Sequence, residues 1–211
     1  MKYSLEDTKW GQVYGSCAAV QAAFDRFGPE YHEAILASGV PAGAARALMP
    51  LLTPEARGID FGCGSGVLGS ALRELGLLTP LDGVDLSPGM LDMARQTGAY
   101  DRLFRANLLL PEESPPLRKP YDFAVTVGLI GDYVPYYVAL PQIVAALRPG
   151  AAIGFAVETT STPWRALAKL VDELGLEVAS ETVLPVPQAK LERQVYHFFA
   201  GKMSSRTADR F

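Results

Sequence analysis

The sequence contains, at residues 58–69, the stretch Gly58-Ile59-Asp60-Phe61-Gly62-Cys63-Gly64-Ser65-Gly66-Val67-Leu68-Gly69. Its first residues are typical of a short buried strand, the alternating glycines of a tight loop, and the apolar positions from Val67 to Leu75 of the inner face of a helix. Glycines lack a Cβ, so the backbone can turn sharply and a ligand can lie directly against it. The stretch therefore predicts a strand–loop–helix unit with a ligand site at the loop.

Outward from this unit, short apolar runs alternate with helical stretches. Further strands are predicted to end at Asp85 and to span Leu103–Ala106, Phe123–Val127 and Ala151–Val157, and helices to begin at Ser87-Pro88, Tyr136 and Pro163. The last two runs, Leu176–Leu184 and Gln194–Ala200, are predicted to form an antiparallel hairpin. Repeated strand–helix–strand units favour a parallel sheet with helices on both faces. The predicted fold is α/β: a Rossmann-like, doubly wound, seven-stranded sheet, mostly parallel, with an antiparallel C-terminal hairpin strand.

The segment before this region reads as helical. Apolar residues recur every three or four positions, which predicts one apolar helix face with Cys17 in the core. This helix is predicted to stop at Gly28-Pro29. A short helical piece and a helix that begins at Pro41 are predicted to follow. The stripe consists of Trp10, Val13, Cys17, Val20, Phe24 and Phe27. We expect residues 1–50 to form a helical cover or lid, residues 51–203 the binding core, and residues 204–211 a mobile tail, with a surface loop at Pro111–Pro120.

Composition limits the function classes. The 211 residues fit one domain, and 19 basic against 23 acidic residues leave a net charge of −4, which offers no basic field for nucleic acid. No signal region is visible, and the longest apolar run has nine residues where a bilayer needs about 20. The two cysteines predict no disulfide framework, and no metal site is expected. A cytoplasmic protein without nucleic-acid or membrane partners, monomeric or homodimeric, is predicted.

Two carboxylates narrow the choice of ligand. Asp85 follows Gly66 by nineteen residues, at the end of the next strand, where a carboxylate can accept hydrogen bonds from both ribose hydroxyls of an adenosine cofactor. The glycine pattern also matches a dinucleotide site. Asp60, however, lies where a pyrophosphate would approach, and its charge favours a ligand that carries an amino group and a sulfonium, either directly or through a water and the loop backbone.

These residues, with Leu147-Arg148-Pro149-Gly150 before a strand, resemble the class I S-adenosylmethionine-dependent methyltransferases over about Glu55 to Val157. The resemblance implies S-adenosylmethionine as cofactor, a ribose on Asp85, and the adenine between Leu86 and Met90. Asn107 stands where the family often has Asp for the adenine amino group; its carbonyl can accept the same hydrogen bond, although it can equally cap a turn. The implied cofactor-binding residues are Tyr31, Asp60, Gly62, Cys63, Gly64, Gly66, Asp85, Leu86, Met90, Asn107, Leu108, Val127, Gly128 and Leu129, with the Cys63 thiol expected to fill space against the strand.

The acceptor side is less determined. Gly131–Tyr137 follows the strand that would face the methyl group, and its tyrosines favour either an aromatic acceptor pocket or the start of a helix packed on the N-terminal helix. Asp132, Tyr133 and His32 are the candidate catalytic residues, for taking a proton or positioning the acceptor. Methyl transfer to a small molecule is the leading hypothesis. An NAD-dependent oxidoreductase and a non-catalytic methyltransferase-like binding module are the alternatives.

Overall fold

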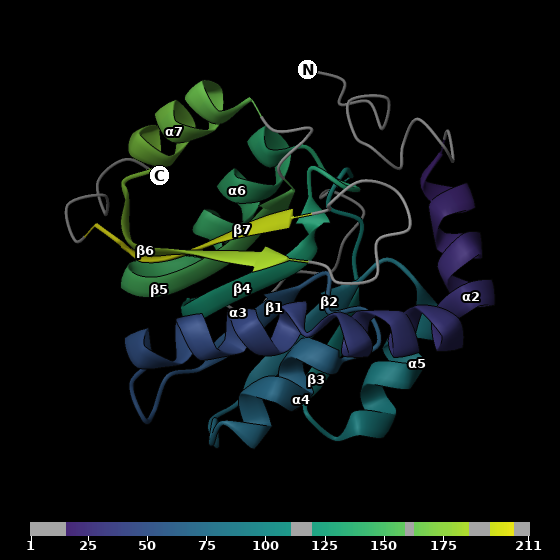
Figure 1. Cartoon of the computed structure of the whole chain (residues 1–211). Coiled ribbons are helices and arrows are strands. Elements are labelled where there is room, and N and C mark those ends of the chain that lie inside the picture. The colour runs from purple at the N-terminus through teal and green to yellow at the C-terminus, as the bar shows by residue number, and fades with distance from the viewer. Residues whose placement is uncertain (1–15, 111–119, 159–162, 186–194, 205–211) are drawn as a thin grey trace.

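The structure, a computed structural model, describes residues 16–110, 120–158, 163–185 and 195–204. At its centre lies a seven-stranded sheet with the order β3-β2-β1-β4-β5-β7-β6 (Figure 1). Strands β1 to β5 pair in parallel, and β7 runs antiparallel to both β5 and β6. The predicted fold class and the C-terminal hairpin are therefore confirmed. The strands are β1 (Gly58–Phe61), β2 (Leu81–Asp85), β3 (Arg102–Arg105), β4 (Tyr121–Ile130), β5 (Leu147–Glu158), β6 (Leu176–Pro185) and β7 (Val195–Met203).

Helices cover both faces of the sheet, as the sequence pattern predicts for buried parallel strands (Figure 1). On one face, α6 and α7 join the apolar cluster that contains Ile59 and Phe61 of β1. On the other, α3 and α4 join the cluster around Phe123 and Val125 of β4. The helices are α2 (Cys17–Ser38), α3 (Val40–Leu48), α4 (Val67–Glu74), α5 (Pro88–Thr97), α6 (Tyr136–Ala145) and α7 (Trp164–Glu173), with a short 3-10 turn, η2 (Met49–Leu51).

Helix α2 corrects one prediction: it continues through Gly28-Pro29 rather than ending there. An internal proline removes one backbone hydrogen bond, but packing can outweigh that loss. Gly28 is buried against α5, where an added Cβ would lie 3.0 Å from the sulfur of Met93. The helix ends instead at Gly39, whose φ of 69° is left-handed and whose N–H donates to the Leu36 carbonyl.

Smaller differences concern element ends. Leu75, predicted on the inner face of a helix, is 42% exposed because α4 has ended one residue earlier. Residues 147–150, which precede the predicted strand Ala151–Val157, already belong to β5. Of the predicted loop at Pro111–Pro120 only Pro120 is described, and of the predicted tail, residues 204–211, only Ser204. Residues 1–15 of the predicted lid also lie outside the described residues.

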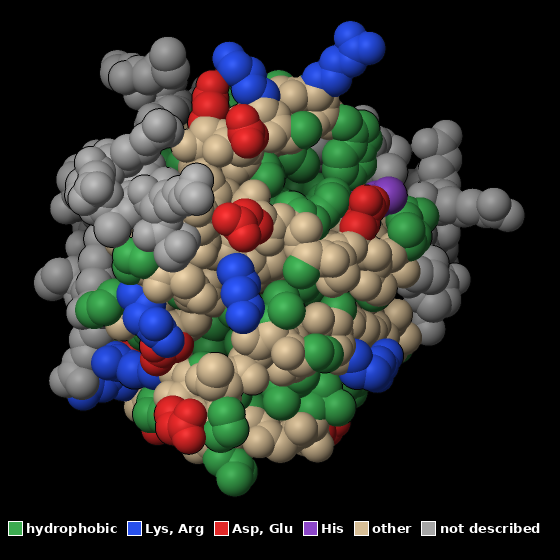
Figure 2. All heavy atoms as spheres, turned by 90° about the vertical axis from the view of Figure 1, so that its left-hand side faces the viewer, with side chains coloured by type: hydrophobic (Ala, Val, Ile, Leu, Met, Phe, Trp, Pro, Cys, Tyr) green, Lys and Arg blue, Asp and Glu red, His purple; other side chains and the backbone are tan. Residues whose placement is uncertain are grey.

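Within the described ranges, no single helix has the length and apolar character needed to cross a bilayer; only α2 taken together with residues 40–51, across a 57° bend, meets both measures. An apolar hollow beside α7 opens on the face that Figure 2 shows. It is lined by Phe155, Trp164, Leu167, Ala168, Val171, Val178, Glu181, His197 and Phe199.

Candidate functional site

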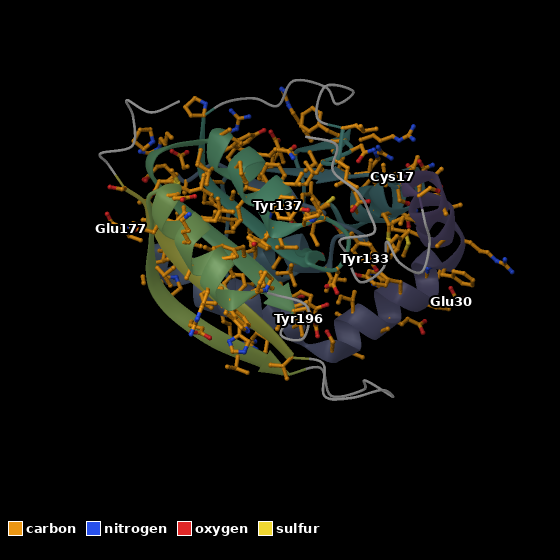
Figure 3. All side chains as sticks on the ribbon, turned by 90° about the horizontal axis from the view of Figure 1, so that it is seen from above. Cys17, Glu30, Tyr133, Tyr137, Glu177 and Tyr196 are labelled. Atoms are coloured by element: carbon orange, nitrogen blue, oxygen red, sulfur yellow. The ribbon has the colours of Figure 1, made fainter. Side chains whose placement is uncertain are left out.

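A cleft lies at the carboxyl ends of β1, β2 and β4, beneath α2. The strand order reverses between β1 and β4, and open α/β sheets bind ligands at such a switch point. Cys17 of α2 and Tyr133 after β4 both line the cleft, in the region between α2 and the sheet that Figure 3 shows. The predicted site residues that line it are Tyr31, Gly62, Gly64, Asp85, Leu86, Met90, Asn107, Leu108, Val127, Gly128, Leu129 and Tyr133.

The glycine loop forms the floor of the cleft. Gly62, Gly64 and Gly66 have φ values of 72°, 52° and 89°, a region that side chains with a Cβ rarely adopt. The N–H groups of Gly62 and Cys63 both donate to the Val84 carbonyl, at 2.8 and 2.9 Å, which ties the loop to β2. The backbone is therefore held close to any ligand that enters the cleft.

Asp85 ends β2 with its carboxylate beside this loop. One oxygen accepts from the Gly64 N–H and the other from the Ser87 N–H, each at 2.9 Å. Burial raises the pKa of Asp85, whereas these backbone hydrogen bonds lower it. A carboxylate offers about four acceptor sites, more than these backbone hydrogen bonds use. The carboxylate is thus fixed in place and can still accept hydrogen bonds from a diol such as a ribose.

Next to Asp85, apolar side chains form a slot of the kind that takes a flat ring. Leu86, Met90 and Leu108 line this part of the cleft, together with Asn107. The Asn107 side-chain oxygen accepts from the Leu109 N–H at 3.0 Å, so it does cap the local turn. Since it also lines the cleft, the turn-capping and ring-binding interpretations of Asn107 are compatible.

Helix α2 forms the wall opposite the sheet. Cys17 lies on this wall with Val20 and Phe24, so its predicted place in the core is wrong. Phe27 of the same predicted stripe is 50% exposed, and Trp10 and Val13 lie outside the described residues. The Phe24 ring meets the rings of Tyr31 and Tyr133 edge-on, with centroids 5.1 and 5.3 Å apart. Burial, with the charges of Asp132 and Asp85, raises the pKa of Tyr31. Tyr31 is therefore a hydrogen-bond donor at neutral pH.

Asp25 fastens α2 to the start of α5. Its Oδ1 accepts from the Ser87 hydroxyl at 2.6 Å and from the Gly89 N–H at 3.0 Å. The Ser87 hydrogen bond lowers the pKa of Asp25. This contact joins the proposed lid to the segment that follows Asp85, while the lid motion itself stays a prediction.

Three residues of the predicted cofactor set do not line the cleft. Asp60 is 1% exposed behind the loop, Cys63 is buried against α5, and an added Cβ on Gly66 would lie 3.0 Å from the Ala94 Cα. Cys63 fills space, as expected, and Gly66 allows α4 and α5 to approach. These residues support the loop from behind.

The candidate catalytic residues separate. Tyr133 lines the cleft, whereas His32 points to the outside of the loop, where its Nδ1 lies 2.9 Å from the Ser65 hydroxyl. Adjacent residues of a helix point about 100° apart, so Tyr31 and His32 cannot both face the cleft. Asp132 is buried beside it and accepts from the Tyr196 hydroxyl at 2.7 Å. No sequence spacing connects Tyr196 with Asp132, so this pair was missed.

Tyr133 lines the cleft and also packs on α2 through Phe24, three residues before α6 begins at Tyr136, and its role toward an acceptor stays a prediction. Trp164 does not line the cleft; its ring lies against His197, with ring centroids 5.0 Å apart. In the part of the chain that the structure describes, no three His, Cys, Asp or Glu side chains gather as a metal site requires.

The family model and the relatives that match this chain are all methyltransferases. A model of the methyltransferase domain family matches residues 36–198. Human methyltransferase-like protein 27 is 32% identical over 144 residues, covering 66% of this chain and 58% of that protein. Ribosomal protein L11 methyltransferase from Shewanella woodyi is 34% identical over 125 residues, covering 57% of this chain and 36% of that protein. The chain thus spans less than two thirds of the length of these relatives.

Solved structures show the same fold. A 1,6-didemethyltoxoflavin-N1-methyltransferase from Burkholderia thailandensis, crystallised with 1,6-didemethyltoxoflavin and S-adenosylhomocysteine, has a TM-score of 0.69 at 19% identity. The match covers 92% of this chain and 90% of that one. At this identity, the similarity concerns the fold alone.

Proposed function

This chain belongs to the methyltransferase domain family, and from that premise we propose that it transfers a methyl group from S-adenosylmethionine to a small-molecule acceptor. The observation that carries the proposal is the position of the Asp85 carboxylate, fixed by Gly64 and Ser87 beside a glycine floor at the switch point of the sheet. S-adenosylmethionine, when bound, supplies a methyl group on a positively charged sulfur.

The cleft fits this cofactor in shape and charge. Asp85 would hold the ribose, the slot of Leu86, Met90 and Leu108 the adenine, and the backbone of the glycine loop the methionine portion. Among the described residues, no Lys or Arg lines the cleft. The ammonium and sulfonium groups of S-adenosylmethionine would lie near the Asp85 carboxylate, with Asp60 behind the loop. A pyrophosphate would lie beside the same Asp85 carboxylate without a compensating cation among the described lining residues. This charge pattern favours methyl transfer over NAD-dependent oxidation.

The acceptor end supports a small, largely apolar substrate. Beyond the glycine loop, the cleft is bounded by Phe24, Tyr31 and Tyr133, with Leu129 and Val134 beside them. Aromatic walls of this kind bind a flat molecule and exclude water, and holding two reactants in line supplies up to about 7–11 kcal/mol of the barrier. Tyr31, held protonated, can donate a hydrogen bond to the acceptor and orient it.

The cofactor is tested by calorimetric titration with S-adenosylmethionine, S-adenosylhomocysteine and NADH. We expect both sulfur nucleosides to bind at micromolar concentration, and Asp85→Ala to weaken them by about 100-fold, since charged hydrogen bonds contribute roughly 1.5–3 kcal/mol each. The matched control is Asp92→Ala, an exposed acid on α5. Binding of NADH alone would favour the oxidoreductase. If none of the three ligands binds, the result would favour a non-catalytic module without a cofactor.

The acceptor class is tested by mass spectrometry of reactions with a panel of small phenols and aromatic amines, and with ribosomal protein L11 in parallel. We expect methylated products from the small molecules, lost in Tyr133→Ala while S-adenosylhomocysteine still binds. Methylation of the protein alone would contradict the small-molecule proposal and leave the methyltransferase assignment intact.

A further inference from the structure

Behind the glycine loop lies a buried acid that the cleft lining does not include. Asp60 is 1% exposed, and one of its oxygens accepts from the Tyr100 hydroxyl at 2.7 Å. Its other oxygen has no hydrogen-bond partner among the described residues. A buried carboxylate with a single donor is unusual, because an unpaired buried charge costs several kcal/mol. Its retention at the end of β1 points to a role at the adjacent cleft.

Tyr100 joins the two ends of the loop. Its hydroxyl donates to Asp60, at the end of β1, and accepts from the Gly69 N–H, in the first turn of α4, at 3.1 Å. The ring packs directly on two glycines: a Cβ on Gly69 would lie 2.4 Å from its Cζ, and a Cβ on Gly83 2.9 Å from its Cδ1. One phenol thus fixes both the carboxylate and the loop that carries the cleft floor.

The groups that face Asp60 leave its charge uncompensated. These are Tyr100, the Cys63 thiol and the Asp85 carboxylate, and none of them is basic. Burial raises the pKa of Asp60 to about 7, the charge of Asp85 raises it further, and the Tyr100 hydrogen bond lowers it. Near neutral pH, a cation in the cleft would therefore determine whether Asp60 is ionised.

We propose that Tyr100 is a positioning residue that holds Asp60 where its charge makes the cleft prefer the positively charged methyl donor over the uncharged thioether product. The inference rests on the proposed function and goes beyond it, because it concerns the relative affinity for donor and product. S-adenosylhomocysteine lacks the sulfonium charge, so it gains less from an ionised Asp60. A site with this preference releases its product more readily at higher pH, relative to the donor.

The effect has a defined size and direction. If the sulfonium lowers the pKa of Asp60 by one unit, the affinity for S-adenosylmethionine rises about sixfold from pH 5.5 to pH 7.5. The affinity for S-adenosylhomocysteine is expected to change less, so the ratio of the two affinities rises with pH.

The test is calorimetric titration of both nucleosides from pH 5.5 to 7.5 on four proteins: wild type, Asp60→Asn, Tyr100→Phe and Tyr121→Phe. Asp60→Asn should abolish the pH dependence of the affinity ratio. Tyr100→Phe should move it to higher pH, because loss of the hydrogen bond raises the pKa of Asp60. Tyr121→Phe removes a buried hydroxyl that donates to another aspartate, Asp82, and should keep the wild-type profile.

An affinity ratio that depends on pH equally in wild type and Asp60→Asn would overturn the inference, as would a Tyr100→Phe profile identical to wild type. If Tyr100→Phe does not fold, Asp60→Asn decides, since its carbonyl still accepts from Tyr100. Failure of both nucleosides to bind the wild type would instead reject the proposed function, so the two failures are distinguishable.

Discussion

Two buried aspartate–tyrosine pairs occupy opposite ends of the same sheet. At the carboxyl end, Tyr100 donates to Asp60 at 2.7 Å; at the amino end, Tyr121 donates to Asp82 at 2.8 Å. The two acids are equally buried, each 1% exposed. They differ in their charged neighbours. The guanidinium of Arg57 lies 3.2 Å from Asp82 and stacks over the Tyr121 ring. Among the described residues, the charged group that acts on Asp60 is another acid, Asp85.

The presence or absence of a compensating cation distinguishes a structural acid from one placed to act on a ligand. At the amino end, the protein neutralises its own buried charge and closes the network. At the carboxyl end, the charge is left beside the cleft that we propose to hold a cationic ligand. Strand ends of equal burial and similar hydrogen bonding thus have different consequences, and the predictions below test whether the distinction holds.

The largest expected effect is on stability at the amino end. Arg57→Met leaves Asp82 buried without its cation; breaking a fully buried pair costs 3–5 kcal/mol, and since the Arg57 side chain is 30% exposed we expect a loss of about 2 kcal/mol. Urea unfolding at pH 7.5 measures it. The affinity for S-adenosylhomocysteine should not change. A loss below about 0.5 kcal/mol would show that Arg57 does not compensate Asp82.

At the carboxyl end, the unfolding free energy should depend on pH through Asp60. Its pKa, raised to about 7 by burial, exceeds that of an unfolded aspartate, so the folded protein binds more protons between pH 4 and 7. Stability is therefore lost as the pH rises through this window. Asparagine does not ionise, so the unfolding free energy of Asp60→Asn, relative to that of the wild type, should rise by about 2 kcal/mol between pH 5 and pH 8. Urea unfolding at the two pH values tests this, with Asp92→Asn as the exposed control.

The two tyrosines offer a matched test of the same point. Tyr100→Phe and Tyr121→Phe each delete one hydroxyl that donates to a buried acid, and each should cost about 1–1.5 kcal/mol. Only the loss of stability in Tyr100→Phe should grow between pH 5.5 and pH 8. Asp60 ionises in this range, and in the variant its charged form lacks the hydrogen bond from Tyr100. Equal pH dependence in both variants would remove the distinction between the two ends.

The smallest expected effect concerns the lid, which covers only the carboxyl end. Asp25→Ala removes the contacts of α2 with Ser87 and Gly89, and should weaken S-adenosylmethionine binding by about threefold, as expected for exposed hydrogen bonds. Saturating cofactor should protect α2 from protease in wild type but less in the variant. Glu33→Ala, an exposed acid on the same helix, is the control. Protease sensitivity of α2 that cofactor does not change would reject the lid.

The sequence predicts well what is local. The glycine loop, the Ser87 cap of α5, the position of Asp85 and the C-terminal hairpin all follow from patterns within a few residues or one strand–helix unit. What it misses depends on tertiary contacts. Packing on Met93 carries α2 through Pro29, and the rotation of α2 that turns Tyr31 rather than His32 to the cleft is set by the same packing.

The buried aspartate–tyrosine hydrogen bonds could not be predicted from the sequence either. Asp60 and Tyr100 are separated by 40 residues, and Asp132 and Tyr196 by 64. Neither pairing follows from a periodicity, because hydrogen bonds between distant elements depend on how the elements pack. The role assigned to Asp60 from sequence, direct or indirect support of a cation, therefore becomes specific only once Tyr100 is seen behind the loop.

The most direct test of the account is a crystal structure of the protein with S-adenosylhomocysteine. We predict the ribose hydroxyls on Asp85, the adenine in the slot of Leu86 and Met90, and the homocysteine portion along the glycine loop, with Asp60 still bonded to Tyr100 behind it. A nucleoside bound elsewhere, or a cleft that remains empty at saturating ligand, would contradict the assignment of the carboxyl end of the sheet as the cofactor site.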